Sequence, residues 1–227
     1  MGSTPARVTR DCKSIMSKPE EVVKFYVLCN KLKVTIRTGW KIWHVKRERL
    51  ESIAEHIYGV QMLAIAMWSE YQYDVNLQKV ILMLALHELE EIKIGDFSPF
   101  EITKEEKLKL GHQAVESLLS GLAAREELKA LILEFDEKKT PEAQFASYCD
   151  KLEADLQCRL YDEAGAVDSS QQDGNIAAED PEVKRLLMEK GNWSEAWLEY
   201  NKNKHDYDEN FAQVSQYAAE HQISSQI

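Results

Sequence analysis

The sequence predicts an all-α protein. Through most of its 227 residues, apolar side chains recur three and four positions apart, which is the spacing that gathers them on one face of a helix. Three capping boxes, each a Ser or Thr followed three positions later by Glu, mark helix starts at Ser17, Ser52 and Thr103. No segment alternates apolar and polar residues as a half-buried strand would.

The first three helices lie in the first hundred residues. One starts at Ser17 and keeps helical spacing to about Leu32, and residues 33–51 form a connector. A second helix runs from Ser52 to about Tyr71. The third runs from near Asn76 to near Gly95, a residue suited to a left-handed helix terminus.

The remaining helices follow in the same way. One opens at the Thr103 box and reaches Leu119, and a shorter one covers about 125–137. Thr140-Pro141 starts another, with proline at the favoured first helical position. The small, polar residues 163–180 read as a flexible linker or long loop, and residues 181–221 as polar helix.

These segments predict a domain plan of four parts. Residues 1–18 form an N-terminal tail, 19–163 the main domain, 164–180 a polar linker or loop, and 181–227 a helical C-terminal extension. Trp193 and Trp197, spaced four apart, are expected to dock the extension on another surface.

Composition excludes several classes of protein. Hydrophobic residues make up 44% and charged residues 30%, as in an ordinary soluble domain, and no apolar run is long enough to span a bilayer. The four cysteines include no CxxC pair, so we expect reduced thiols in a cytoplasmic protein. A net charge of −11 without a basic stripe argues against a nucleic-acid polymer as partner, whereas a small anionic ligand stays possible.

The run LMLALHELEEIKIGD (82–96) leads an apolar helix into ionisable residues. On one continuous helix, Val80, Leu84, His87, Glu88 and Glu91 would share a face. A buried carboxylate must pair, bind a cation or face a cleft, and acids near a helix C-terminus oppose the dipole. The alternative is a helix end that emerges into solvent with its carboxylates exposed.

His56 and Asp150 could compensate these acids. Each has a simpler explanation, a hydrogen-bonded core histidine for His56 and an ion pair with Lys151 or Arg159 for Asp150. Taken together, imidazoles and carboxylates from three helices suit Mn²⁺, Co²⁺ or Fe²⁺ better than an all-oxygen Mg²⁺ or Ca²⁺ site.

Four segments together form a specific pattern, namely RTGW (37–40), ESIAEH (51–56), ALHELEEIKIGD (85–96) and TPEAQFASYCDKLEA (140–154). In these segments the sequence resembles the HD-domain phosphohydrolases, in particular the short branch that includes the bacterial 5′-deoxynucleotidase. The resemblance covers about residues 19–163. It implies a bundle of five or six helices around one divalent metal ion (Mn, Co, Fe or Mg), with His56, His87, Glu88 and Asp150 as ligands.

The same resemblance implies roles for four further residues. Glu91 would activate the attacking water and Asp96 would be a second catalytic acid, while Arg37 and Trp40 would hold the nucleotide. Trp40 could equally be a core aromatic residue. His112, on an apolar stripe, is expected to be a hydrogen-bonded core histidine rather than a ligand to a second metal.

The chain departs from the family at one position, because the usual His-Asp pair is His87-Glu88 here. Glutamate keeps the charge but carries its carboxylate about 1.5 Å further, against ligand tolerances of about 0.2 Å. A literal His-Asp pair occurs at His205-Asp206, within a polar run that we expect to be solvated.

The leading functional hypothesis is a metal-dependent phosphohydrolase that acts on (deoxy)nucleoside 5′-monophosphates. A triphosphohydrolase that releases tripolyphosphate is a variant of it. The competing hypothesis is a pseudoenzyme, inactivated by Glu88, that binds metal or nucleotide and works through its C-terminal extension. A homodimer is also expected from the resemblance.

Overall fold

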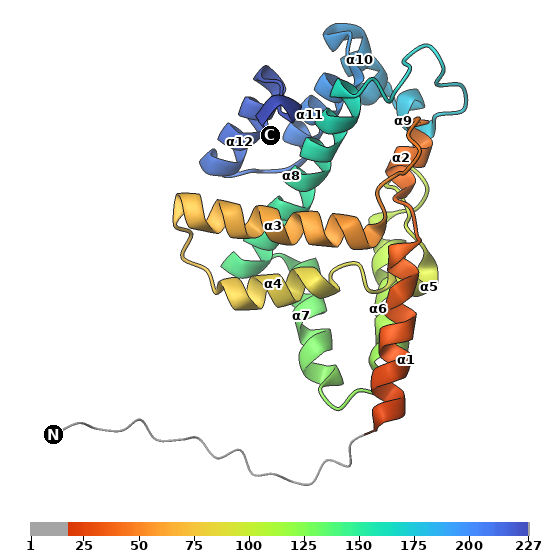
Figure 1. Ribbon diagram of the computed structural model, residues 1–227, viewed down its shortest axis with the longest axis vertical. Coiled ribbons are helices and arrows are strands. Elements are labelled where there is room, and N and C mark those ends of the chain that lie inside the picture. The colour runs from red at the N-terminus through yellow and green to blue at the C-terminus, as the bar shows by residue number, and fades with distance from the viewer. Residues whose placement is uncertain (1–17, 227) are drawn as a thin grey trace, which may run out of the picture.

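The computed structural model describes residues 18–226, and these fold into helices joined by turns and loops (Figure 1). Within them there is no strand, and the only β-type pairing is an isolated bridge between Ile36 and Ser52. No helix in this part of the chain is both long and apolar enough to cross a membrane. The helices are α1 (Pro19–Cys29), η1 (Asn30–Lys33), α2 (Thr38–Ile42), α3 (Ile53–Tyr71), α4 (Leu77–Leu86), α5 (Glu91–Ile94), α6 (Lys104–Leu119), α7 (Arg125–Glu137), α8 (Pro141–Glu163), α9 (Ile176–Glu179), α10 (Pro181–Lys190), α11 (Trp193–Lys204), α12 (Glu209–Glu220) and η2 (Ser224–Gln226).

Two of the predicted capping boxes are present. The Ser52 side chain accepts a hydrogen bond from the backbone of Glu55, whose carboxylate accepts one from the Ser52 backbone in return. Thr103 and Glu106 make the same exchange at the start of α6. The Ser52 box fixes the first turn of α3 and therefore the position of His56. Ser17, from the third predicted box, lies outside the described residues.

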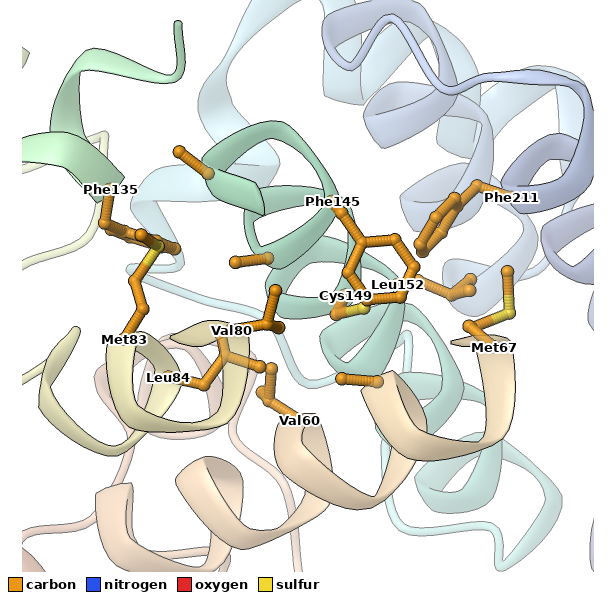
Figure 2. Packing of buried hydrophobic residues seen from close by; sticks show 13 residues of the cluster. Val60, Met67, Val80, Met83, Leu84, Phe135, Phe145, Cys149, Leu152 and Phe211 are labelled. Carbon is orange, nitrogen blue, oxygen red and sulfur yellow. The ribbon is translucent and has the colours of Figure 1, made fainter. Parts of the chain in front are cut away.

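The long helix α8 organises the bundle. It packs against α3 and α4, which lie one above the other across the middle of the molecule, and against α7, α11 and α12 (Figure 1). The main core fills the space between these helices, as Figure 2 shows. Burial of this apolar surface supplies the main driving force for folding. The largest of its side chains are Val60, Met67, Val80, Met83, Leu84, Phe135, Phe145, Leu152 and Phe211.

The prediction of one continuous helix from Asn76 to Gly95 is wrong. Helix α4 ends at Leu86, a tight turn follows, and α5 begins at Glu91. Within the turn, backbone N–H groups donate to carbonyls three residues back, as from Leu89 to Leu86. With this three-residue repeat, the side chain at every third position points into a second core cluster. In a helix with 3.6 residues per turn, successive positions three apart would instead rotate away from it. The members of this run are Leu86, Leu89 and Ile92.

The break also relieves the conflict between one of the acids and the helix dipole. Glu91 now lies in the first turn of α5, where a negative charge is favoured. Gly95 ends α5 with a φ of 81°, a conformation that glycine adopts without a steric penalty.

The C-terminal extension docks through aromatic rings, as Trp193 and Trp197 predicted. The Trp197 ring stacks on Trp40 of α2 at 5.7 Å between centroids, and Trp193 packs on Trp43 at 5.4 Å. The residues expected to form a linker join the same cluster, since Ala166 and Ala177 are buried in it. Their small side chains allow close packing, although the polar composition around them predicts a loop.

A buried carboxylate ties the extension to α8. Asp155 is fully buried and accepts hydrogen bonds from Trp197 and Asn201 of α11 and from Tyr207 in the following loop. Burial raises the pKa of Asp155 to about 7, although the three donors oppose this shift. These bonds offset the cost of burying the carboxyl group and hold α11 against α8.

Candidate metal centre

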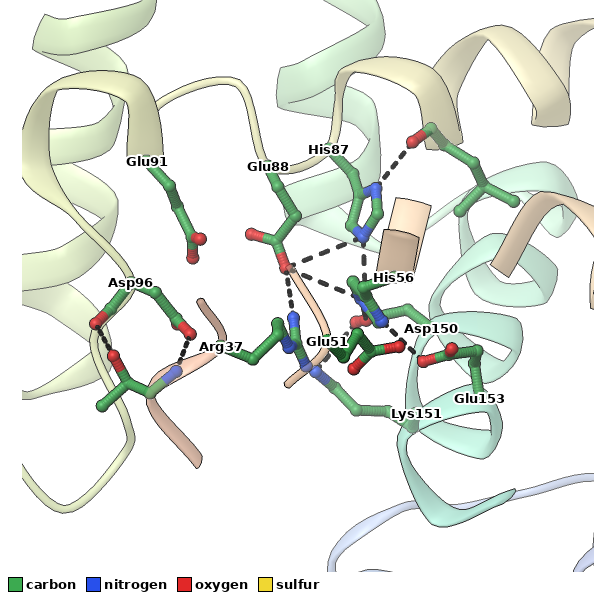
Figure 3. Close-up of polar contacts among 12 residues, drawn as sticks. Arg37, Glu51, His56, His87, Glu88, Glu91, Asp96, Asp150, Lys151 and Glu153 are labelled. Carbon is green, nitrogen blue, oxygen red and sulfur yellow. Dashed lines mark hydrogen bonds and ion pairs between the residues drawn. The ribbon is translucent and has the colours of Figure 1, made fainter. Parts of the chain in front are cut away.

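Four side chains from three separate segments converge at the centre of the bundle (Figure 3). His56 comes from the first turn of α3, His87 and Glu88 from the turn after α4, and Asp150 from the middle of α8. All four are buried, and each offers one ligand atom, all lying within 4.8 Å of one another. The structure therefore brings together the four residues that the sequence analysis expected to bind metal.

The distances show how the two carboxylates face the two imidazoles. Asp150 Oδ1 lies 3.1 Å from His56 Nε2 and 3.7 Å from His87 Nε2. Glu88 Oε1 lies 3.9 Å and 3.7 Å from the same two nitrogens. The longer glutamate side chain thus still places an oxygen within the cluster.

Both imidazoles are oriented by hydrogen bonds on their outer nitrogens. His87 Nδ1 lies 2.7 Å from the Leu84 carbonyl oxygen, and because a carbonyl only accepts, Nδ1 must be the donor. His56 Nδ1 lies 2.6 Å from Glu153 Oε2. Both rings consequently turn Nε2 into the cluster, an arrangement typical of metal-binding histidines.

The electrostatics of the cluster favour a cation. Burial would lower the pKa of His56, but its hydrogen bonds to Asp150 and Glu153 raise it to about 9. Burial would raise the pKa of Glu88, but the charges around it, His87 first, lower it to about 2. The carboxylates are therefore ionised and ready to coordinate.

Two glutamates that the sequence analysis missed support His56 from behind. Glu153 accepts from its Nδ1, and Glu51, buried beside them, accepts a 2.8 Å hydrogen bond from Trp40 Nε1. Burial and then the charge of Glu153 raise the pKa of Glu51 to about 7. One signal was available, because Glu153 follows Asp150 by three positions and must share its helix face.

Glu91 lies beside the cluster with one oxygen held and the other free. Its Oε1 accepts a 2.9 Å hydrogen bond from Lys107 of α6. Its Oε2 is buried and has no hydrogen-bond partner among residues 18–226. Burial, and next the charge of Glu88, raise the pKa of Glu91 to about 11, while Lys107 opposes the shift.

Arg37 contacts the cluster directly, and Asp96 holds the segment that carries Arg37. Arg37 Nη1 donates to Glu88 Oε1 at 3.2 Å. Asp96 Oδ2 accepts a 2.6 Å hydrogen bond from the Thr38 backbone, and its carbonyl accepts one from the Thr38 hydroxyl. Asp96 therefore fixes the start of α2, and with it the residue that precedes it, Arg37.

Trp40 lies in the core beneath this segment. It is 2% exposed, and it contacts the rings of Trp197 and Tyr161 and the carboxylate of Glu51. This geometry corresponds to the alternative of a core aromatic residue.

His112 and His205, the two other histidines discussed above, do not belong to the cluster. His112 pairs with Asp136 at 2.8 Å, and His205 is partly buried in the loop after α11.

A cavity of about 190 Å³ opens onto the cluster, with His87, Glu88 and Asp150 at its inner end. The residues that line it, within the described part of the chain, do not include Arg37 or Trp40. Arg37 reaches this site only through Glu88, which lines the cavity and accepts its hydrogen bond. The apolar part of its wall is formed by Leu108, Val115, Ile132 and Phe135.

The sequence is similar to a known protein family and to individual members of known name. Residues 29–183 match a family model described as an HD domain. The 5′-deoxynucleotidase hdd1 of Schizosaccharomyces pombe is 32% identical over 153 residues, which cover 64% of this chain and 75% of that protein. The 5′-deoxynucleotidase HDDC2 of Dictyostelium discoideum is 33% identical over 148 residues, which cover 62% and 77%.

Solved structures share the fold at lower identity. The PH0347 protein of Pyrococcus horikoshii superposes with a TM-score of 0.61 at 22% identity, covering 87% of this chain and 98% of that one. A structure from Magnetospirillum magnetotacticum, named a predicted metal-dependent phosphohydrolase, gives a TM-score of 0.55 at 21% identity, covering 89% and 94%. The matched segment of 155 residues holds all four clustered side chains and spans well over half of the sequence. The chain therefore belongs to the HD-domain family.

Proposed function

We propose that this protein is a metal-dependent phosphohydrolase whose substrates are (deoxy)nucleoside 5′-monophosphates. One observation carries the proposal: two imidazole nitrogens and two carboxylate oxygens, all buried, lie within 4.8 Å of one another at the end of a cavity. The substrate class is supported by the relatives, which are named 5′-deoxynucleotidases.

The residues present fit a divalent metal ion. His87 Nε2 is buried without a hydrogen-bond partner among residues 18–226, and such an acceptor costs about 1–3 kcal/mol unless something binds it. A mixed set of nitrogen and oxygen donors suits Mn²⁺, Co²⁺ or Fe²⁺ before Mg²⁺. We propose His56, His87, Glu88 and Asp150 as the residues that hold the ion. When bound, such an ion supplies charge neutralisation for the phosphate and a more acidic water.

The protein's own groups would supply the rest of the chemistry. The raised pKa of Glu91 would fall beside a bound cation, and the ionised carboxylate would then orient the attacking water or accept its proton through the free Oε2 atom. Asp96 would protonate the leaving 5′-oxygen, in addition to holding Thr38. Arg37, which already donates to Glu88, would pair with the phosphate, and Trp40 would act on the nucleotide indirectly, by anchoring this segment.

A reconstitution assay tests the proposal directly. Metal-stripped protein is incubated with deoxynucleoside and ribonucleoside 5′-monophosphates and with deoxynucleoside triphosphates, each with Mn²⁺, Co²⁺, Fe²⁺ or Mg²⁺. We expect release of inorganic phosphate from the monophosphates, and only when a metal is added. Release of tripolyphosphate would identify a triphosphohydrolase instead, and tight metal binding without turnover would identify a binding module.

Glu88→Asp is expected to weaken the site, although it restores the residue that is usual in the family. Shortening the side chain withdraws the carboxylate by about 1.5 Å from an arrangement that is adjusted to glutamate, including its 3.2 Å contact with Arg37. We expect about tenfold weaker Mn²⁺ binding and a lower kcat/KM, measured by calorimetry and phosphate release. A large gain in rate would mean instead that glutamate detunes the native site.

Two further predictions stay open as proposals. We propose a cytoplasmic location, consistent with the free thiols of Cys29, Cys149 and Cys158. We also retain the homodimer, which exposed apolar side chains on α3 such as Tyr58 and Met62 would serve.

A further inference from the structure

Four lysines line the cavity that leads to the cluster, and one of them, Lys107, is paired with Glu91. The other three come from three different segments. Lys104 is the first residue of α6, Lys138 ends α7, and Lys151 lies on α8 next to Asp150. We call Lys104, Lys138 and Lys151 the lysine rim. Lys151 Nζ contacts Asp150 Oδ2 at 2.8 Å. Within residues 18–226, the side chains of Lys104 and Lys138 have no hydrogen bond or ion pair.

Helix stability does not explain why lysines occupy the positions of Lys104 and Lys138. Lysine at the N-terminus of a helix, as at Lys104, opposes the helix dipole. Lys138 complements the dipole at the end of α7, but it adopts the left-handed conformation with a φ of 53°, which costs a non-glycine residue about 1–2 kcal/mol. Each of the two lysines therefore lowers the stability of its own helix end.

The rim also concentrates like charge in an acidic protein. The chain has 39 acidic and 28 basic residues, so unpaired carboxylates are plentiful, yet these two lysines have none as partner. Burial and then the charge of Lys151 lower the pKa of Lys138, while the charge of Asp150 opposes the shift. The cavity wall also carries four carboxylates, but none of them forms an ion pair with Lys104 or Lys138; they belong to Glu88, Glu90, Asp136 and Asp150. Converging cations repel one another unless an anion lies between them. The cavity provides the space for one.

We propose that the lysine rim binds the phosphate group of the substrate as it enters the cavity and retains the inorganic phosphate product before release. This inference rests on the proposed function and adds three phosphate-binding residues to Arg37. The ligand class is a tetrahedral oxyanion, which lysine ammonium groups bind through charge-assisted hydrogen bonds. When Asp150 shares its charge with a bound cation, its ion pair with Lys151 would weaken. The Lys151 ammonium group would then be available to bind phosphate.

The test compares two double variants with the same change of charge. Lys104→Gln/Lys138→Gln removes two rim cations, whereas the control Lys129→Gln/Lys139→Gln removes two cations that pair with surface glutamates outside the cavity. Calorimetric titration of Mn²⁺-loaded protein with inorganic phosphate measures binding without turnover. We expect the rim variant to bind phosphate at least about tenfold more weakly, and the control to match the wild type.

Kinetics distinguish a binding role from a structural one. With a deoxynucleoside 5′-monophosphate, the rim variant should raise KM and the inhibition constant of phosphate by about tenfold, with a much smaller change in kcat. Lys104→Arg/Lys138→Arg should restore both constants. If the rim variant binds phosphate as tightly as the control, the inference is refuted while the proposed function stands. If the wild type hydrolyses no nucleotide, the proposed function fails, and the phosphate titration still decides the role of the rim.

Discussion

His87→Ala is expected to reduce affinity for Mn²⁺ or Co²⁺ more than about 100-fold, the upper range for losing a residue that only supports a ligand. His87 Nε2 is the buried atom in the cluster for which the described residues supply no hydrogen bond, and its ring is locked by the bond from Nδ1 to Leu84. Removing it takes a preoriented nitrogen donor from the set of four. Because metal dependence is proposed for catalysis, phosphate release should fall to background.

Binding and stability measurements check this without relying on turnover. A ligand that binds only the folded state raises the melting temperature, so Mn²⁺ should stabilise the wild type and leave His87→Ala unchanged. His205→Ala is the control, since it removes the literal His-Asp motif outside the cluster. If His87→Ala still binds Mn²⁺ tightly, the cation binds outside the proposed cluster.

Local rules predicted the parts of the fold that short sequences determine. The capping boxes at Ser52 and Thr103 form as expected, because each is a set of hydrogen bonds within four residues. The break after Leu86 could not be predicted from periodicity. It depends on a second core cluster, to which α6 contributes Val115, more than twenty residues further along the chain. Tertiary packing there overrides helical continuity.

The residues of the candidate site were likewise predicted only in part. His56, His87, Glu88 and Asp150 were expected together because of a resemblance, and no spacing rule alone would have joined them. Lys151 was named as a possible partner of Asp150, and the two form an ion pair. Other partners that complete the site were missed, namely Lys107 for Glu91 and Lys104 and Lys138 at the cavity. Such residues look like surface charges in the sequence, and only the crossing of α6, α7 and α8 shows that they face one cavity.

Glu91→Gln is expected to lower kcat by about 10²–10⁴-fold, the usual contribution of a general base, with little change in KM or Mn²⁺ affinity. The geometry separates the two oxygens of Glu91, because Oε1 is held by Lys107 and Oε2 is buried without a partner. Glutamine keeps the shape and can still accept from Lys107, but it cannot take a proton from water. The rate should therefore fall while the site stays assembled.

The exposed residue Glu127 on α7 gives a matched control, and Glu127→Gln should retain full activity. Glu91→Asp keeps the charge but withdraws it by one methylene, so its kcat should lie between those of Glu91→Gln and the wild type. Steady-state kinetics with Mn²⁺ and a deoxynucleoside 5′-monophosphate measure all three variants. A kcat for Glu91→Gln close to the wild-type value would assign proton transfer to another group, and Asp96, an acid near Arg37 that is not a proposed metal ligand, would then be the residue to substitute.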